Sequence, residues 1–285
     1  MSKKISKSKV IDVFADVHSH RQMMNLIKRH STNRHDVREI AIRGLNLRHA
    51  GNILDLGCGF GFFTAALKDK IHPRAVVTGV DLIQGYERMF LETCMNAGLE
   101  GRFLSGNAPL IKKFQDKTFD LILCSYSLYF FPDLIPVISR ILKGHGFFIV
   151  ITHGRDNMSE LVSVTKDVLA GNSAHRDQKL PLESIISQFS SENGFSLLSP
   201  WFSRVETVDY SNSLVFRPED SKELVEYFLF KSPFLLSGTD TEMEWFIHLL
   251  SGKLQQPSFI EEGFTISKND RIYICSLPCG HSKAS

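Results

Sequence analysis

From residue 52 onward, short apolar runs alternate with stretches of helical periodicity, and this alternation constrains the fold more than any other feature. Short runs bounded by turn residues are typical of buried strands, and a repeated order of strand, helix and strand predicts a parallel sheet. Right-handed crossovers would place the carboxyl ends of these strands along one edge, where α/β proteins build their sites. The apolar runs lie at residues 53–56, 76–80, 103–104, 121–124 and 147–151.

Two helices between these runs have ends that the sequence predicts. Residues 87–97 are expected to be helical up to Gly98, because glycine adopts the left-handed closing conformation without a steric penalty. A second helix is expected at residues 134–142, ended by Gly144. Both helices fit crossovers of a doubly wound sheet.

Helical periodicity before and after the alternating region predicts further helices around the core. Two amphipathic helices joined around residues 30–33 precede the core. Further elements are expected near residues 159–169, 182–192, 204–216 (strand-like), 218–230, 240–254 and 271–277 (the last strand). We expect an N-terminal helical cap (1–50), a core (51–217), an inserted helical lid (218–262), and the last core strand with a tail (263–285). Cap or lid residues with packing as the expected role are Phe14, His18, Phe228 and Trp245.

The overall charge excludes little, because 33 Lys and Arg nearly balance 31 Asp and Glu. Locally, the segment from His18 to His49 is basic, which is usual for a solvated helical face but could also attract an acidic substrate. Its basic residues are Arg21, Lys28, Arg29, Arg34, Arg38, Arg43 and Arg48, against Asp36 and Glu39.

Cysteine usage predicts a reducing compartment. No signal-peptide pattern precedes the five scattered cysteines, so we expect a cytoplasmic protein without disulfides. Cys275, Cys279 and His281 are too few for a closed zinc site, and no metal is expected. The apolar runs are far shorter than the ~20 residues that cross a bilayer, so no membrane partner is expected, and we expect a monomer. The five cysteines are Cys58, Cys94, Cys124, Cys275 and Cys279.

A glycine loop follows the first predicted strand and carries the strongest functional signal. Residues 55–61 read Asp-Leu-Gly-Cys-Gly-Phe-Gly, and glycines allow the backbone to approach a ligand closely. The spacing Gly-x-Gly-x-Gly, the acid Asp55 two residues before the first glycine, and Asp81 at the end of the second strand distinguish this loop from a dinucleotide-binding loop.

Together these features resemble the pattern of S-adenosylmethionine (SAM) dependent methyltransferases, with S-adenosyl-L-homocysteine as product. The resemblance implies a Rossmann-like, mostly parallel seven-stranded sheet with a helical lid. It also implies that the glycine loop lies near the methionine portion of SAM, that Asp81 accepts both ribose hydroxyls, that Asn107 lies near adenine, and that Ser125 contributes backbone contacts. The implied cofactor-binding residues are Asp55, Gly57, Gly59, Gly61, Asp81, Leu82, Asn107, Ala108 and Ser125.

Segments outside the core resemble the histamine N-methyltransferase-like family. These segments are His-Ser-Thr-Asn at residues 30–33, Leu-Tyr-Phe-Phe-Pro-Asp at 128–133 and Leu-Gln-Gln-Pro-Ser-Phe at 254–259. Asn269 matches the family's carboxyl-terminal asparagine, whereas Asn33 stands where the family has an acid and Tyr126 where it has a glutamine. Loss of the carboxylate removes a charge-assisted hydrogen bond, which argues against histamine itself. The implied acceptor-binding residues are Asn33, Tyr126, Tyr129 and Asn269.

Several functions fit this sequence. The leading hypothesis is methylation of a small amine or imidazole nitrogen; O-methylation of a small acid or phenol, RNA methylation and SAM binding without catalysis are the alternatives. Methyl transfer can proceed by positioning alone, so no catalytic residue is required. If a base is used, His153 is the first candidate because histidine titrates near neutrality, and Tyr129 is the second. For His153 a structural role is the more common one.

Overall fold

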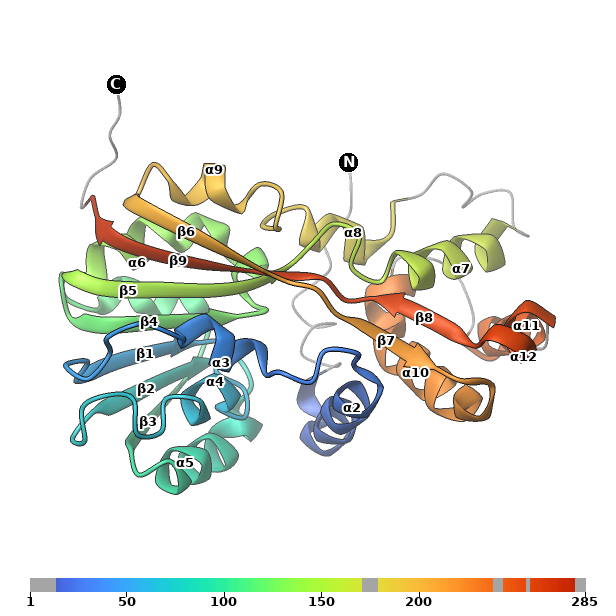
Figure 1. The fold of residues 1–285 in the computed structure, drawn as a ribbon, viewed down its shortest axis with the longest axis horizontal. Helices are drawn as coiled ribbons and strands as arrows, with labels where there is room; N and C mark the ends of the chain where they lie inside the picture. Colours follow the sequence, from blue (N-terminus) through green and yellow to red (C-terminus); the bar gives the residue numbers. More distant parts are fainter. Residues whose placement is uncertain (1–13, 171–178, 238–242, 255–256, 280–285) are drawn as a thin grey trace. The chain divides into compact units, whose positions relative to one another are not determined.

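The chain divides into two compact units in the computed structural model, which describes residues 14–170, 179–237, 243–254 and 257–279. The core unit consists of His35–Gly154, Gln188–Tyr210 and Asp270–Ser285. The helical unit consists of Met1–Arg34, Arg155–Ser187 and Ser211–Asn269. Figure 1 labels the elements of both units.

A seven-stranded sheet forms the centre of the core unit, in the order β3-β2-β1-β4-β5-β9-β6. The first five strands of this order pair in parallel, whereas β9 runs antiparallel to both β5 and β6. This mostly parallel, Rossmann-like sheet confirms the expected fold class. The strands are β1 (Asn52–Leu56), β2 (Val76–Asp81), β3 (Glu100–Ser105), β4 (Phe119–Ser125), β5 (Leu142–His153), β6 (Phe202–Tyr210) and β9 (Asp270–Pro278).

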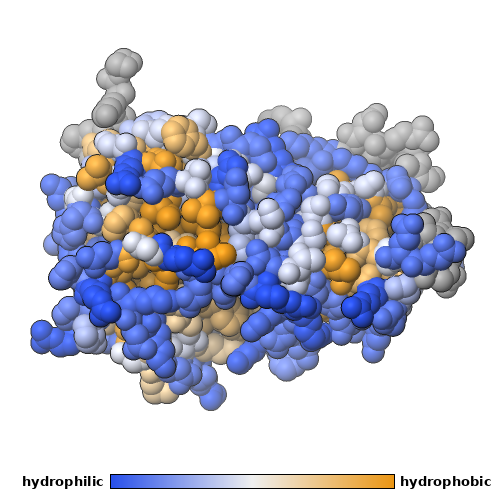
Figure 2. All heavy atoms as spheres, in the orientation of Figure 1, coloured by the Kyte–Doolittle hydropathy of each residue, from blue (hydrophilic) through white to orange (hydrophobic). Residues whose placement is uncertain are grey.

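Helices flank this sheet, and each face has its own hydrophobic cluster. Successive strand residues point to opposite faces, so Ile53 and Leu121 join one cluster while Leu54 and Ile122 join the other. The first cluster includes α3 (Val37–Ile42), α4 (Phe62–Ala65) and α5 (Glu87–Asn96). The second includes η2 (Ala108–Lys113), η3 (Leu128–Phe130), η4 (Pro132–Leu134), α6 (Ile135–Ile141) and α9 (Gly194–Leu198). Figure 2 shows a mostly hydrophilic surface with an apolar area over β4, β5 and β9.

One predicted helix end is confirmed and one is wrong. Helix α5 ends at Asn96, and Gly98 has a φ of 73° in the left-handed region. Helix α6 ends at Ile141, and the chain continues directly into β5 because Leu142 is already extended and pairs with Phe119. Gly144 therefore lies inside a strand and does not end a helix.

The helical unit has a hydrophobic cluster of its own, which includes Phe216, Tyr227, Phe228 and Phe246. Phe14 packs against this cluster, whereas the side chain of Trp245 is exposed. A two-stranded antiparallel sheet belongs to the unit, formed by β7 (Ser213–Phe216) and β8 (Phe264–Ser267). Its helices are α2 (Val17–His30), α7 (Ser159–Ala170), α8 (Pro181–Ile186), η6 (Pro218–Asp220), α10 (Ser221–Leu236), α11 (Met243–Leu254) and α12 (Pro257–Glu262).

The boundaries of the two units differ from the four expected parts. Residues 35–50 belong to the core unit, whereas Arg155–Ser187 belongs to the helical unit. The expected strand at residues 204–216 is broken at residues 211–212 into β6 of the core unit and β7 of the helical unit. Alternation along the sequence did not reveal this change of partner, because pairing of β6 with β9 and of β7 with β8 joins segments that are distant in the sequence. Residues 240–242 of the predicted lid helix lie outside the described residues.

The basic segment between His18 and His49 is divided between the two units. Arg21, Lys28, Arg29 and Arg34 are in the helical unit, and the other three basic residues are in the core unit. Arg29 pairs with Glu223, so part of this charge is neutralised locally. All five cysteines are free thiols, as expected. Across the described ranges, no helix has both the length and the apolar character needed to cross a bilayer.

A buried carboxyl group ties β1 to α4. Thr64 Oγ1 donates a hydrogen bond to Asp55 Oδ2 at 2.8 Å, and Asp55 is only 1% exposed. Burial raises the pKa of Asp55 to about 7, with the charge of Asp81 adding to the rise and the bond from Thr64 opposing it. The folded core therefore holds a proton on Asp55 more tightly than an unfolded chain does.

Replacing Asp55 with Asn should remove a pH dependence of stability. Asn keeps an oxygen that accepts from Thr64 but carries no charge. Because the pKa of Asp55 is about 7 in the fold against an ordinary value of 3.8, wild-type stability falls as the pH rises from about 4 to 7. The free energy of unfolding of Asp55→Asn minus that of the wild type should therefore increase by up to about 4 kcal/mol between about pH 4 and pH 7. Above pH 7 this difference should change little.

Urea denaturation at pH 5, 6, 7 and 8, followed by circular dichroism, measures this difference. Glu92→Gln on the exposed face of α5 is the matched control, and its difference from the wild type should not vary with pH in this way. If the difference in free energy of unfolding between Asp55→Asn and the wild type stays constant over the four pH values, the raised pKa of Asp55 in the folded protein is contradicted.

Candidate functional site

The glycine loop connects β1 to α4 with three residues in the left-handed region. Gly57, Gly59 and Gly61 have φ values of 70°, 48° and 76°. A Cβ atom at Gly57 would lie 2.6 Å from Ser127 Oγ, and one at Gly61 would lie 3.0 Å from the ring of Phe90. These two glycines are therefore required by the packing of the loop itself.

Gly59 differs from its two neighbours because space is open above it. No atom lies within 4 Å of the position that a Cβ atom would take. Its backbone N–H donates to Asp81 Oδ2 at 2.9 Å, which fixes the loop against the end of β2. The loop thus offers a backbone surface that a ligand can approach closely.

Asp81, the last residue of β2, presents a carboxylate beside this open position. Its Oδ1 accepts from the N–H of Ile83 at 3.0 Å, and its Oδ2 accepts from Gly59. Burial raises the pKa of Asp81, and the two backbone donors act in the opposite direction. Each carboxylate oxygen has capacity for a further hydrogen bond, so Asp81 can accept from two adjacent hydroxyl groups.

The other predicted cofactor residues lie at the same edge of the sheet. The N–H of Gly106 donates to the backbone oxygen of Asp81 at 2.8 Å, which brings the turn with Asn107 next to the end of β2. Asn107 is exposed, whereas Leu82, Ala108 and Ser125 are partly buried. Asp55 lies behind the loop, with its carboxyl group bonded to Thr64 instead of facing solvent.

A second group of polar side chains lies where β4, β5 and β9 meet in the core unit. Tyr126 donates its hydroxyl hydrogen to Asp270 Oδ2 at 2.6 Å, and His153 Nδ1 lies 2.6 Å from Asp270 Oδ1. The ring of Tyr126 is stacked on that of His153, with centroids 4.6 Å apart. The ring of Tyr129 is also nearly parallel to that of His153, with centroids 6.2 Å apart. The structure therefore brings together Tyr126, Tyr129 and His153.

Asp270 is the residue of this group that the sequence analysis missed. It precedes the last apolar run directly, and β9 is antiparallel to β5, so the first residue of β9 pairs in register with the last residue of β5. The acidic residue at the start of that apolar run could have been identified as a site residue if the last strand had been taken as antiparallel, because its first residue then lies at the carboxyl edge of the sheet.

Both tyrosines are held in their protonated form. Burial raises the pKa of Tyr126 well above its ordinary value, and the neighbouring carboxylate of Asp270 adds to the rise. Burial also raises the pKa of Tyr129. Each hydroxyl group therefore keeps its hydrogen, and that of Tyr126 is donated to Asp270.

The two predicted asparagines lie in the helical unit, and both contact the turn at Ser211 and Asn212. Asn33 Nδ2 donates to the oxygen of Ser211 at 3.0 Å, and Asn269 Oδ1 accepts from the N–H of Asn212 at 3.2 Å. Asn269 Nδ2 also donates to Asp156 Oδ2 at 3.1 Å. Their amides thus take part in bonds within the unit, and acceptor binding by either stays a prediction.

One cluster in the helical unit has the residue types of a metal site. The ligand atoms of His30, Asp220 and Glu223 lie within 4.8 Å of one another. Glu223 is already paired with both His30 and Arg29, and His30 Nδ1 lies 2.8 Å from the oxygen of Val215. Ion pairing between α2 and α10 accounts for this cluster. Of the tail residues considered for zinc, His281 lies outside the described residues.

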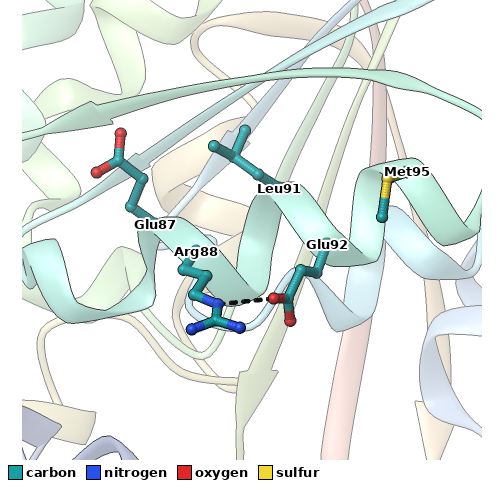
Figure 3. A pocket seen from close by; sticks show the side chains of 5 residues that line it. All are labelled: Glu87, Arg88, Leu91, Glu92 and Met95. Carbon is teal, nitrogen blue, oxygen red and sulfur yellow. Dashed lines mark hydrogen bonds and ion pairs between the residues drawn. The ribbon is translucent and has the colours of Figure 1, made fainter.

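A surface hollow on the core unit is distinct from both groups. Figure 3 shows it on the outer face of α5, where the ion pair between Arg88 and Glu92 lies beside Leu91 and Met95. None of the predicted site residues lines it. The candidate functional site is therefore the carboxyl edge of the sheet and not this hollow.

Comparison with solved structures supports the fold. The YcgJ protein of Bacillus subtilis has a TM-score of 0.52 and 15% sequence identity, with 84% of this chain and 97% of that chain covered. At this identity the likeness shows a shared fold and does not define a function.

Sequence comparison identifies relatives with a named substrate. Demethylmenaquinone methyltransferase of Geobacillus stearothermophilus is 26% identical over 51% of this chain and 63% of its own length. The enzyme of the same name from Staphylococcus aureus is 27% identical over 52% of this chain and 61% of its own length. The chain thus spans less than two thirds of these relatives. They do not support the resemblance to histamine N-methyltransferase-like enzymes, nor an amine or imidazole acceptor.

A family model gives the broader assignment. The model described as the ubiE/COQ5 methyltransferase family matches residues 2–167, which include the glycine loop, Asp81 and the ends of β4 and β5. Because the match covers more than half of the 285 residues, this chain belongs to the ubiE/COQ5 methyltransferase family.

Proposed function

We propose that this protein is a SAM-dependent methyltransferase whose acceptor is a small ring compound carrying a hydroxyl group. The observation that supports cofactor binding is the pairing of Gly59 with Asp81. Open space above Gly59 lies next to a carboxylate with remaining acceptor capacity, and these features suit a nucleoside with two adjacent hydroxyl groups.

In this proposal each cofactor residue has a separate task. The backbone of residues 57–61 contacts the methionine portion, Asp81 accepts the ribose hydroxyls, and Asn107 with Ala108 contacts the adenine edge. Ser125 at the end of β4 contributes backbone contacts to the amino acid portion. Asp55 supports the loop through Thr64 and does not need to touch the ligand.

The chemistry requires little more than positioning. SAM, when bound, supplies a methyl group on a sulfonium, and the methyl–sulfur bond breaks with its electron pair left on sulfur while an electron pair of the acceptor forms the new bond. The residues of the chain hold the acceptor in line with that methyl group, and such positioning can supply most of the acceleration.

The relatives motivate the acceptor class. Their name identifies demethylmenaquinone as their substrate, and the reduced form of such a quinone is a ring with hydroxyl groups. Tyr126 and Tyr129 are protonated aromatic side chains at the end of β4, suited to packing against a ring. The hydroxyl of Tyr129 can donate to an oxygen atom of that ring, whereas the hydroxyl of Tyr126 donates to Asp270. We therefore propose methylation at a ring carbon, with O-methylation of a phenol as the alternative.

RNA methylation has weaker support. The basic residues that motivated it are divided between two units, and Arg29 already has an acidic partner. SAM binding without catalysis is the remaining hypothesis, and a transfer assay distinguishes it from the proposal.

Asp81→Asn should weaken SAM binding about 10- to 100-fold, because it removes the charged acceptor for two hydroxyl groups. Isothermal titration calorimetry with SAM and S-adenosylhomocysteine measures the affinity, and circular dichroism checks that the fold is retained. Glu92→Gln is again the control, since its carboxylate lies on the outer face of α5 and pairs with Arg88.

Gly59→Ala provides a second variant that leaves the carboxylate in place. Its methyl group would occupy the open position above the loop without meeting protein atoms, so binding should weaken while the protein stays folded. Unchanged affinity in both variants would contradict the cofactor site.

Acceptor class is tested with SAM carrying a labelled methyl group. We expect label on 1,4-dihydroxynaphthalene and none on histamine or RNA, with carbon-13 NMR placing the methyl on a ring carbon. A methyl on oxygen would favour the phenol alternative. Label on histamine alone would overturn the proposed acceptor class, and cofactor binding without transfer to any acceptor would favour the non-catalytic hypothesis.

A further inference from the structure

We propose that Arg38 binds the carboxylate of the cofactor's amino acid portion through its guanidinium group. The inference rests on the proposed function and deepens it, because it assigns a charged partner to a part of the cofactor for which the glycine loop offers only uncharged backbone groups. Its basis is the position of Arg38, which lies on α3 of the core unit beside the residue that follows the loop.

Arg38 differs from the other two basic residues that the segment from His18 to His49 contributes to the core unit. Arg43 and Arg48 are exposed, whereas the side chain of Arg38 is only 14% exposed. Withdrawing a charged group from water is costly unless hydrogen bonds and an opposite charge compensate it. Burial therefore separates Arg38 from a merely solvated basic surface.

The guanidinium group lies next to the start of α4. Its Cζ atom is 5.4 Å from the centroid of the Phe62 ring, and Phe62 directly follows the last glycine of the loop. Burial raises the pKa of both Asp55 and Tyr126, and the positive charge of Arg38 opposes the rise in each. Arg38 is therefore within electrostatic reach of the glycine loop and of the residue after Ser125.

Only one nitrogen of this guanidinium group is bonded to the described part of the chain. Nη1 of Arg38 lies 3.3 and 3.2 Å from the two carboxylate oxygens of Asp36, to which it donates. Nε and Nη2 make no hydrogen bond to a described residue. These two nitrogens form one edge of the planar group, and such an edge matches the two oxygens of a carboxylate. Arg38 can thus bind Asp36 and a ligand carboxylate at the same time.

Two acids of the core unit compete with a ligand for the charge of Arg38, and both compete weakly. The side chain of Asp36 is 49% exposed, so water screens its pair with Arg38. Asp55 accepts from Thr64, and burial raises its pKa to about 7, which favours its neutral form. Neither acid therefore replaces a carboxylate bound at the edge formed by Nε and Nη2.

The charge of the cofactor complements this edge. The amino acid portion of SAM and of S-adenosylhomocysteine carries a carboxylate at neutral pH. The proposed function places this portion against the backbone of the glycine loop and of Ser125, and Arg38 acts electrostatically at both places. Because Arg38 is poorly exposed, its attraction for a carboxylate is less screened by water than that of a surface arginine.

Calorimetry with ligands that differ in the amino acid portion tests the assignment without turnover. S-adenosylhomocysteine has the carboxylate, whereas 5′-methylthioadenosine keeps the thioether nucleoside and lacks the amino acid portion. Arg38→Met should weaken binding of S-adenosylhomocysteine by about 10- to 100-fold, because a charge-assisted pair is lost, and should leave the affinity for 5′-methylthioadenosine unchanged. Arg88→Met on the outer face of α5 is the matched control, and both affinities should stay at their wild-type values.

A second ligand pair separates the carboxylate from the amine of the amino acid portion. Decarboxylated SAM keeps the amine and the sulfonium, so the wild type should prefer SAM to it, and Arg38→Met should lose this preference. Arg38→Lys keeps the charge but not the two-nitrogen edge, and its affinity for S-adenosylhomocysteine should lie between those of the wild type and Arg38→Met. Thermal melting followed by circular dichroism checks the fold of each variant, and Arg38→Lys provides the comparison if Arg38→Met does not fold.

The outcomes separate this inference from the proposed function. Absence of S-adenosylhomocysteine binding in the wild type overturns the proposed function. If the wild type binds, unchanged affinity in a folded Arg38 variant, or an equal loss for S-adenosylhomocysteine and 5′-methylthioadenosine, overturns the carboxylate assignment and leaves the proposed function standing. Asp81→Asn should differ from the Arg38 variants by weakening both ligands, because both contain the ribose hydroxyls.

Discussion

Parallel pairing of β1 with β2 and β4 is the constraint on which the candidate site depends. The register aligns Leu56 with Val80 and with Cys124, so three strands end at the same level of the sheet. Parallel strands that end together release their loops on one side of the sheet. The glycine loop, Asp81 and Ser125 become neighbours for this reason.

The antiparallel strand β9 adds what parallel strands alone could not. Its first residue lies at the carboxyl edge, because its direction is opposite to that of β5. A carboxylate at the start of β9 thus joins a histidine at the end of β5, although 117 residues separate them. In the sheet, β9 lies between the parallel strand β5 and the edge strand β6. Pairing of β9 therefore both extends the sheet to β6 and places Asp270 at the carboxyl edge.

Local chemistry made much of this arrangement predictable. Short apolar runs gave the parallel strands, and the spacing of Gly57, Gly59 and Gly61 gave the loop, because left-handed backbone and close approach both demand glycine. Gly98 ended its helix as expected, but Gly144 did not, since a glycine can equally lie within a strand whose pairing is set elsewhere. The resemblance to histamine N-methyltransferase-like enzymes relied on three short segments, and the comparisons do not support it.

By itself the sequence determined the order of strands and helices in the core, the identity of the loop, and the presence of Asp81 at a strand end, because these follow from periodicity and from steric rules acting over a few residues. Only the tertiary structure decided that the stretch around residues 204–216 is shared by two units, that Asp55 is bonded to Thr64, and that Asp270 joins Tyr126 and His153. These outcomes depend on which distant strands pair and in which direction, and that choice is made by the free energy of packing the whole sheet.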